Sequence, residues 1–215
     1  MQDNAKTLLL LVALVSVIVI GVTLYDKFFK KRQSVSQEEL LYIYLISAIQ
    51  SKEEDEFVSD MCYDLPLNVL RLKDENGSTV LHYVMEYGCV DAARVLIERL
   101  KYEDFVAVDH FKVTPLMSSI YSHDIHICAL LIKNLQIKDL NAQDAEGKTA
   151  LMIACDEYEQ GNTHSQELAK IGILLVEAMS TRGLLIKDNK GLTALEYAYN
   201  YGMKNVVYAI EQKIQ

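Results

Sequence analysis

A phrase of four residues that begins with threonine recurs four times along the chain, and it restricts the fold more than any other feature. The copies begin at Thr79, Thr114, Thr149 and Thr193, and each has a leucine two residues later. The intervals between the threonines are 35, 35 and 44 residues. Similar segments at a nearly constant spacing indicate a solenoid, in which stacked units bury a common core. The sequence therefore predicts a stack of similar units, an architecture suited to binding.

The residues around each phrase predict the local structure of a unit. Each phrase follows an aspartate by five residues, and in three copies a glycine lies between them. The aspartates are Asp74, Asp109, Asp144 and Asp188, and the glycines are Gly77, Gly147 and Gly191. Asp-x-x-Gly favours a tight turn because glycine readily adopts positive φ. Threonine then caps a helix, and proline is tolerated in its first turn. Each unit is predicted to contain a turn, a short helix and a second helix.

These phrases resemble the T-P-L-H of ankyrin repeats, most closely at Thr114-Pro115-Leu116-Met117 and Thr79-Val80-Leu81-His82. Residues 139–144 also resemble the link that joins one repeat of that family to the next. The resemblance covers residues 74–215 well and residues 36–73 loosely. It implies an all-α ankyrin-repeat solenoid with repeats at 74–108, 109–143, 144–187 and 188–215.

Three departures from the family pattern bear on the geometry. Lys112 stands where the other repeats have glycine, which leaves its turn geometry open, and His123 stands where repeats one and four have Gly88 and Gly202. Repeat three is nine residues longer than the other intervals, around 156–164. This polar insertion is predicted to be an extended helix end or a surface loop, with Thr163 capping the resumed helix. A functional role and neutral drift are both open.

Residues 36–73 precede the first phrase and are predicted to form a capping helix pair. Ser36-Gln-Glu-Glu39 and Ser51-Lys-Glu-Glu54 both have the S-x-x-E form of a capping box, and apolar residues follow each at helical spacing. Terminal units of a solenoid expose one face to solvent and so diverge from the interior units.

Residues 7–25 carry no charge over 19 positions, which predicts a transmembrane helix after a short tail at 1–6. Such a helix would be about 28 Å long, close to the hydrocarbon thickness of a bilayer. A cleaved signal peptide and a buried core helix are the alternatives, but the run is long for a signal peptide. The linker at 26–35 contains Lys27, Lys30, Lys31 and Arg32. The positive-inside tendency therefore predicts a single-pass protein with its repeats on the cytoplasmic side.

The charge and the cysteines restrict the partners and the compartment. The chain carries a net charge of −9, and residues 1–32 are net positive, so residues 33–215 are more acidic than the whole. An acidic domain repels nucleic acid and favours a protein partner with a basic surface. The four cysteines form no C-x-x-C pair and are expected to be buried, reduced thiols.

The resemblance implies that partners bind to the turn tips and to the exposed face of each first helix. At the tips these positions are Glu75, Asn76, Ser78, His110, Phe111, Val113, Ala145, Glu146, Lys148, Asn189, Lys190 and Leu192. On the helices they are Glu86, Tyr87, Tyr121, Ser122, Asp156, Glu157, Asn200 and Tyr201. Phe111 is either a central contact for a partner or folds onto the neighbouring turn. The tyrosines are either contact residues or pack along the helices.

The sequence contains no phosphate-binding glycine loop, no G-x-S-x-G and no H-E-x-x-H. His123 and His126 have a spacing that metal sites use, but no further ligands accompany them. A hydrogen bond to turn backbone would account for His82 without catalysis. We expect a membrane-tethered adaptor that is not an enzyme and has no cofactor, metal or small-molecule substrate. A structural subunit of a membrane complex and an inhibitor or immunity protein are the alternatives.

Overall fold

The computed structural model describes residues 35–159 and 163–215. The predicted tail (1–6), the predicted membrane helix (7–25) and residues 26–34 of the linker lie outside the described residues. Within the described ranges, no helix combines the length and the apolar character needed to cross a bilayer.

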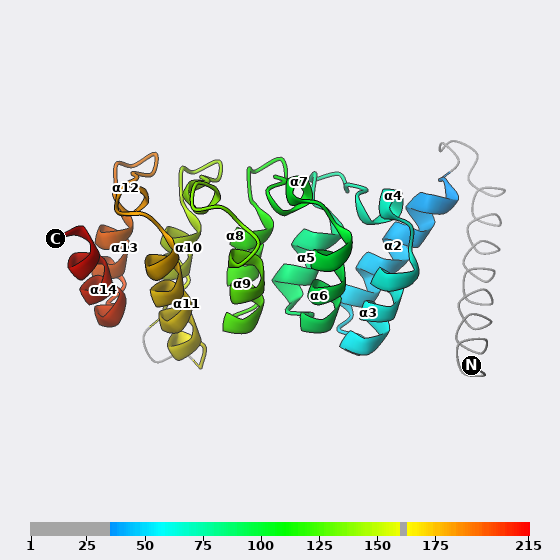
Figure 1. Cartoon of the computed structure of the whole chain (residues 1–215), viewed down its shortest axis with the longest axis horizontal. Helices are drawn as coiled ribbons and strands as arrows, with labels where there is room; N and C mark the ends of the chain where they lie inside the picture. Colours follow the sequence, from blue (N-terminus) through cyan, green and yellow to red (C-terminus); the bar gives the residue numbers. More distant parts are fainter. Residues whose placement is uncertain (1–34, 160–162) are drawn as a thin grey trace.

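The helices stack in two rows along the length of the molecule, as Figure 1 shows. The first-helix row consists of α2 (Gln37–Gln50), α5 (Val80–Tyr87), α8 (Pro115–Ile120), α10 (Ala150–Asp156) and α13 (Ala194–Asn200). The second-helix row consists of α3 (Asp55–Asp64), α6 (Val90–Arg99), α9 (Ile125–Ile132), α11 (Ser165–Ala178) and α14 (Lys204–Ile214). The short helices α4 (Leu67–Leu70), α7 (Tyr102–Phe105), η1 (Asp139–Asn141) and α12 (Thr181–Leu184) lead from each second helix to the next turn. Every regular element of the described residues is helical, as predicted.

The phrase leucines of repeats one to three are buried in the common core. Leu81, Leu116 and Leu151 are at most 2% exposed, because each lies between two neighbouring units. Burying one such side chain contributes roughly 1.5–3 kcal/mol. Leu195, in the last unit, is only half-buried. Stacking, and not the single unit, therefore creates the core.

One of the two predicted capping boxes forms. The Glu39 N–H donates to the Ser36 hydroxyl at 3.1 Å, and the Ser36 N–H donates to the Glu39 carboxylate at 2.7 Å. The prediction for Ser51 is wrong, because Ser51 ends α2 and its hydroxyl donates to the Ala48 carbonyl at 3.1 Å. Glu54 precedes α3 instead, without a side-chain cap.

The two departures in repeat two keep the backbone of the other repeats. Lys112 has φ 60°, beside 82° at Gly77 and Gly147, and His123 has φ 55°, beside 76° at Gly88. The turns therefore survive, although a side chain in this left-handed region is strained by about 1–2 kcal/mol relative to glycine.

The second helix of repeat three is longer than that of repeat two. α11 has 14 residues, whereas its counterpart α9 has 8. α11 begins at Ser165 with His164 at its cap position, so the predicted cap at Thr163 is one residue too early. The His164 ring stacks on His123 of repeat two, with ring centroids 4.4 Å apart. The insertion is thus attached to the preceding unit.

Candidate interaction groove

Each repeat carries a hairpin tip that is built by one aspartate. Its Oδ1 oxygen accepts hydrogen bonds from the backbone N–H groups two and four residues later, at 2.7–3.0 Å. The aspartates are Asp74, Asp109, Asp144 and Asp188. The backbone N–H of each aspartate also donates to the carbonyl four residues later at 2.9–3.1 Å. Four similar tips are therefore held in one conformation.

Backbone hydrogen bonds join each tip to the next. The His110 N–H donates to the Asn76 carbonyl and the Ala145 N–H donates to the Phe111 carbonyl, both at 2.8 Å. The Asn189 N–H donates to the Glu146 carbonyl at 3.0 Å. These bonds fix the spacing of the tips and hence the register of any partner that contacts several of them.

His82 joins repeats one and two through its side chain. The Thr79 N–H donates to His82 Nδ1 at 3.2 Å, so the proton of the neutral ring lies on Nε2, which donates to the Val113 carbonyl at 3.1 Å. Burial lowers the pKa of His82 and keeps the ring neutral. The predicted hydrogen bond to turn backbone is confirmed.

A groove of about 360 Å³ lies between the tips and the first helices of repeats one and two. We call it the groove. Its lining residues are Gln50, Asn76, Ser78, His82, Tyr83, Glu86, Tyr87, Asp109, Phe111, Val113, Ser118 and Tyr121. The Phe111 side chain is 59% exposed and that of Tyr121 is 44% exposed. Phe111 therefore does not fold away onto the neighbouring turn.

Glu86 is the carboxylate of the groove that its surroundings leave unpaired. Within the described residues its side chain has no hydrogen bond or ion pair, whereas Asp109 accepts two backbone hydrogen bonds. Glu86 is exposed, and partial desolvation by its neighbours raises the pKa of its carboxyl above its ordinary value. No lysine or arginine lines the groove. The groove is thus aromatic and acidic.

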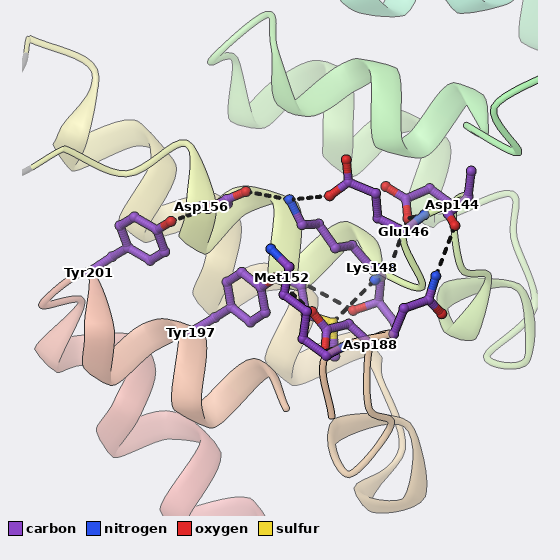
Figure 2. Close-up of polar contacts among 12 residues, drawn as sticks. Asp144, Glu146, Lys148, Met152, Asp156, Asp188, Tyr197 and Tyr201 are labelled. Atoms are coloured by element: carbon purple, nitrogen blue, oxygen red, sulfur yellow. Dashed lines mark hydrogen bonds and ion pairs between the residues drawn. The ribbon is translucent and has the colours of Figure 1, made fainter. Parts of the chain in front are cut away.

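Repeats three and four have a different arrangement at the corresponding positions, shown in Figure 2. Lys148 Nζ lies 2.6 Å from Asp156 Oδ2 and 3.0 Å from a Glu146 carboxylate oxygen. The Tyr201 hydroxyl donates to the other oxygen of Asp156. The Lys148 ammonium also lies 5.9 Å from the centre of the Tyr197 ring, and the Tyr197 hydroxyl donates to Asp188 at 2.9 Å. We call Glu146, Lys148, Asp156, Tyr197 and Tyr201 the lysine network.

The charged groups of the lysine network all have partners within it. Burial alone would lower the pKa of Lys148, but the hydrogen bonds with Asp156 and Glu146 raise it above its ordinary value. Burial would raise the pKa of Asp156, and its hydrogen bonds with Lys148 and Tyr201 hold it below its ordinary value instead. At neutral pH both groups are therefore charged and already paired.

Comparison with protein families matches residues 45–144 to ankyrin repeats, in three copies. The match begins inside α2, so it includes the end of α2 and all of α3 before the first phrase. Residues 45–144 are ankyrin repeats. The predicted resemblance is confirmed for this part of the chain, and ankyrin repeats indicate a role in binding proteins.

The residues that the ankyrin pattern assigned to binding fall into three groups. The first group lines the groove: Asn76, Ser78, Glu86, Tyr87, Phe111, Val113 and Tyr121. The second belongs to the lysine network: Glu146, Lys148, Asp156 and Tyr201. The third lines neither: Glu75, His110, Ala145, Glu157, Asn189, Lys190 and Asn200 are exposed, and Ser122 and Leu192 are half-buried. The groove thus contains assigned residues of repeats one and two, and the lysine network contains assigned residues of repeats three and four.

Sequence reasoning missed Gln50, His82, Tyr83, Asp109 and Ser118 as groove residues. Tyr83 and Ser118 occupy the same position of their repeats, four residues after the phrase threonine. Aligning the repeats with one another could therefore have identified both as groove residues. Gln50 is the last residue of α2, which lacks the phrase. No local pattern therefore shows that Gln50 is equivalent to the groove positions of the repeats.

In the parts of the chain that the structure describes, no group of three or more His, Cys, Asp or Glu side chains is placed to hold a metal ion. His123 stacks on His164, and His126 is an exposed residue in the first turn of α9. The pKa of His123 is lowered by burial and by the neighbouring His164.

Proposed function

We propose that this chain is a non-enzymatic interaction module that holds one partner protein at a membrane. The ankyrin repeats bind the partner, and residues 7–25 form the anchor. The observation that carries the binding proposal is the groove, in which the exposed rings of Phe111 and Tyr121 lie beside unpaired Glu86. Exposed aromatic side chains around a hollow are typical of interface hot spots.

The partner is proposed to present a basic surface. The chain carries a net charge of −9, and the groove contains carboxylates and no lysine or arginine. Opposite charge on the partner would speed encounter and fix its orientation. The proposed binding surface is the full row of tips and first-helix faces. The groove residues are proposed to contribute most of the binding free energy.

Replacing Phe111 and Tyr121 together by alanine is expected to weaken partner capture by about 30-fold or more, because truncating a hot-spot aromatic costs about 2 kcal/mol. The tagged full-length chain would be captured from gently solubilised membranes, and the bound partner quantified. The melting temperature should stay near that of the wild type, since both side chains are substantially exposed.

The matched control is Tyr63→Ala with Tyr208→Ala, which removes two aromatic side chains that are 70% and 65% exposed on the second-helix row. This control should retain the partner. If the groove variant retains the same membrane assembly as the control, the binding proposal fails and an accessory-subunit role takes its place.

The repeats are proposed to lie on the cytoplasmic side, with a single membrane span. The support is the basic cluster after residue 25 and four buried cysteines that suit a reducing compartment. In right-side-out membrane vesicles the repeats should be protected from added protease until the membrane is permeabilised. Digestion in intact vesicles would place them on the opposite side.

A further inference from the structure

The lysine network shows how this fold holds a basic side chain. Lys148 directly precedes the phrase threonine of repeat three, and Asp156 follows that threonine by seven residues. Their side chains meet at 2.6 Å, and Tyr197 and Tyr201 of the next repeat flank them. One lysine is thus held by two carboxylates, those of Asp156 and Glu146, beside two aromatic residues, all from the chain itself.

Repeat one holds a carboxylate at the position of Asp156, has Asn76 at the position of Glu146, and lacks the cation. Glu86 corresponds to Asp156, but Ser78 stands in place of Lys148. Ser118 and Ser122 of repeat two stand in place of Tyr197 and Tyr201. Three small side chains therefore replace one lysine and two tyrosines, and two of the three, Ser78 and Ser118, line the groove.

The groove supplies aromatic residues from other positions. Tyr87, Phe111 and Tyr121 line it together with Glu86. Burial raises the pKa of Tyr121, and nearby carboxylates, Glu157 first, add to this effect. An ammonium or guanidinium group within about 6 Å of an aromatic face is attracted to it.

Glu86 is open to an incoming cation. The residue is exposed, and no lysine or arginine of the described residues forms an ion pair with it. The raised pKa of its carboxyl is consistent with partial desolvation by the walls of the groove, which lessens the further loss of hydration when an ion pair forms.

We propose that the groove is the receptor for one Lys or Arg side chain of the partner protein, with Glu86 as its counter-charge and Tyr87, Phe111 and Tyr121 around it. This inference rests on the proposed function and names what the groove takes. The partner's basic side chain occupies the place that Lys148 fills in repeat three.

The test uses the full chain in detergent micelles and a display library of random linear peptides as the probe. Peptides that lose binding to the Phe111→Ala, Tyr121→Ala variant define groove binders. These peptides are expected to share one Lys or Arg at a fixed position. Replacing that residue by Gln should weaken binding at least 10-fold, and Glu86→Gln should weaken it to a similar extent.

The two changes should not add. On the Glu86→Gln protein, the Lys-to-Gln or Arg-to-Gln change in the peptide is expected to have little further effect, because the pair is already broken. Glu98→Gln, on the exposed side of α6 in the same repeat, makes the same charge change outside the groove and should leave binding unchanged.

Folding of the variant is checked by its melting temperature. Because the pKa of Glu86 is raised in the folded state, its ionised form opposes folding above that pKa and has no effect below the ordinary glutamate value. Glu86→Gln should therefore melt at or slightly above the wild-type temperature at pH 7.

A second variant places a lysine of the chain itself in the groove. Ser78→Lys places a lysine where repeat three has Lys148, and the backbone bonds of position 78 are the same as those of position 148. This lysine should pair with Glu86 and block the groove, so that the basic peptides lose binding while the protein stays folded. Ser78→Gln is the control for side-chain size.

The outcomes separate this inference from the proposed function. Groove binders without a fixed basic residue, or with one that does not couple to Glu86, overturn the inference and leave the proposed function standing. Binders that ignore the Phe111→Ala, Tyr121→Ala change, or a library that yields no binder, overturn both.

Discussion

Replacing Gly147 by alanine is expected to destabilise the protein by about 3 kcal/mol, because the methyl group adds backbone strain and a clash with the next tip. Gly147 has φ 82°, which strains any other residue. An added Cβ would also lie 2.7 Å from the Asn189 backbone nitrogen and 2.7 Å from its side-chain oxygen. That nitrogen donates the hydrogen bond that joins tips three and four. Urea unfolding at neutral pH measures the loss.

Gly191→Ala is the matched control. Gly191 has nearly the same φ, 83°, but a Cβ added there meets nothing within 4 Å, because no tip follows it. Only the backbone strain should remain, about 1 kcal/mol. Equal losses for the two variants would show that contact between tips contributes nothing to stability.

Replacing Lys148 by methionine is expected to destabilise the protein by about 2 kcal/mol at neutral pH, because it leaves a half-buried carboxylate without its cation. The Lys148 side chain is 14% exposed and that of Asp156 is 27% exposed, so solvent screens the pair only in part. The effect should shrink on acidification. The low pKa of Asp156 stabilises the wild type above the ordinary aspartate value, and this contribution is lost as the pH falls through the folded-state pKa.

Two comparisons check this assignment. Lys170→Met breaks the exposed pair with Glu167, whose side chains are 56% and 36% exposed, and should cost less than about 1 kcal/mol. Lys148→Met combined with Asp156→Asn should be less damaging than the sum of the two single changes. Additive losses would mean that the two charges do not stabilise each other.

The repeat geometry could be predicted from the sequence because its determinants are local. Each aspartate bonds to N–H groups two and four residues away, and Thr114 caps α8 through a residue three positions on. The turn at Lys112 was harder to predict because lysine rarely adopts positive φ, and here φ is 60°. Hydrogen bonds to the neighbouring tips stabilise this turn, and they are not apparent from the local sequence.

The groove and the lysine network could not be predicted in the same way. Asp156 and Tyr201 are 45 residues apart, and their contact depends on how two repeats stack. The predicted capping box at Ser51 was wrong for a related reason. The S-x-x-E pattern fits a helix start, but α2 continues to Gln50, and Ser51 is its C-cap residue. Local patterns define the units, and contacts between units decide which surface stays open.

The buried cysteines give this protein its own reporters of partial unfolding. Cys62 lies in α3, Cys89 precedes α6, Cys128 lies in α9 and Cys155 lies in α10, so four successive units each hold one thiol. Burial raises the pKa of Cys62 to about 12 and those of Cys89 and Cys128 to about 11, and it raises that of Cys155 as well. A thiol reagent therefore reacts only where a unit has opened. Mass spectrometry of labelled fragments would show the order in which the stack comes apart, without any probe having been introduced.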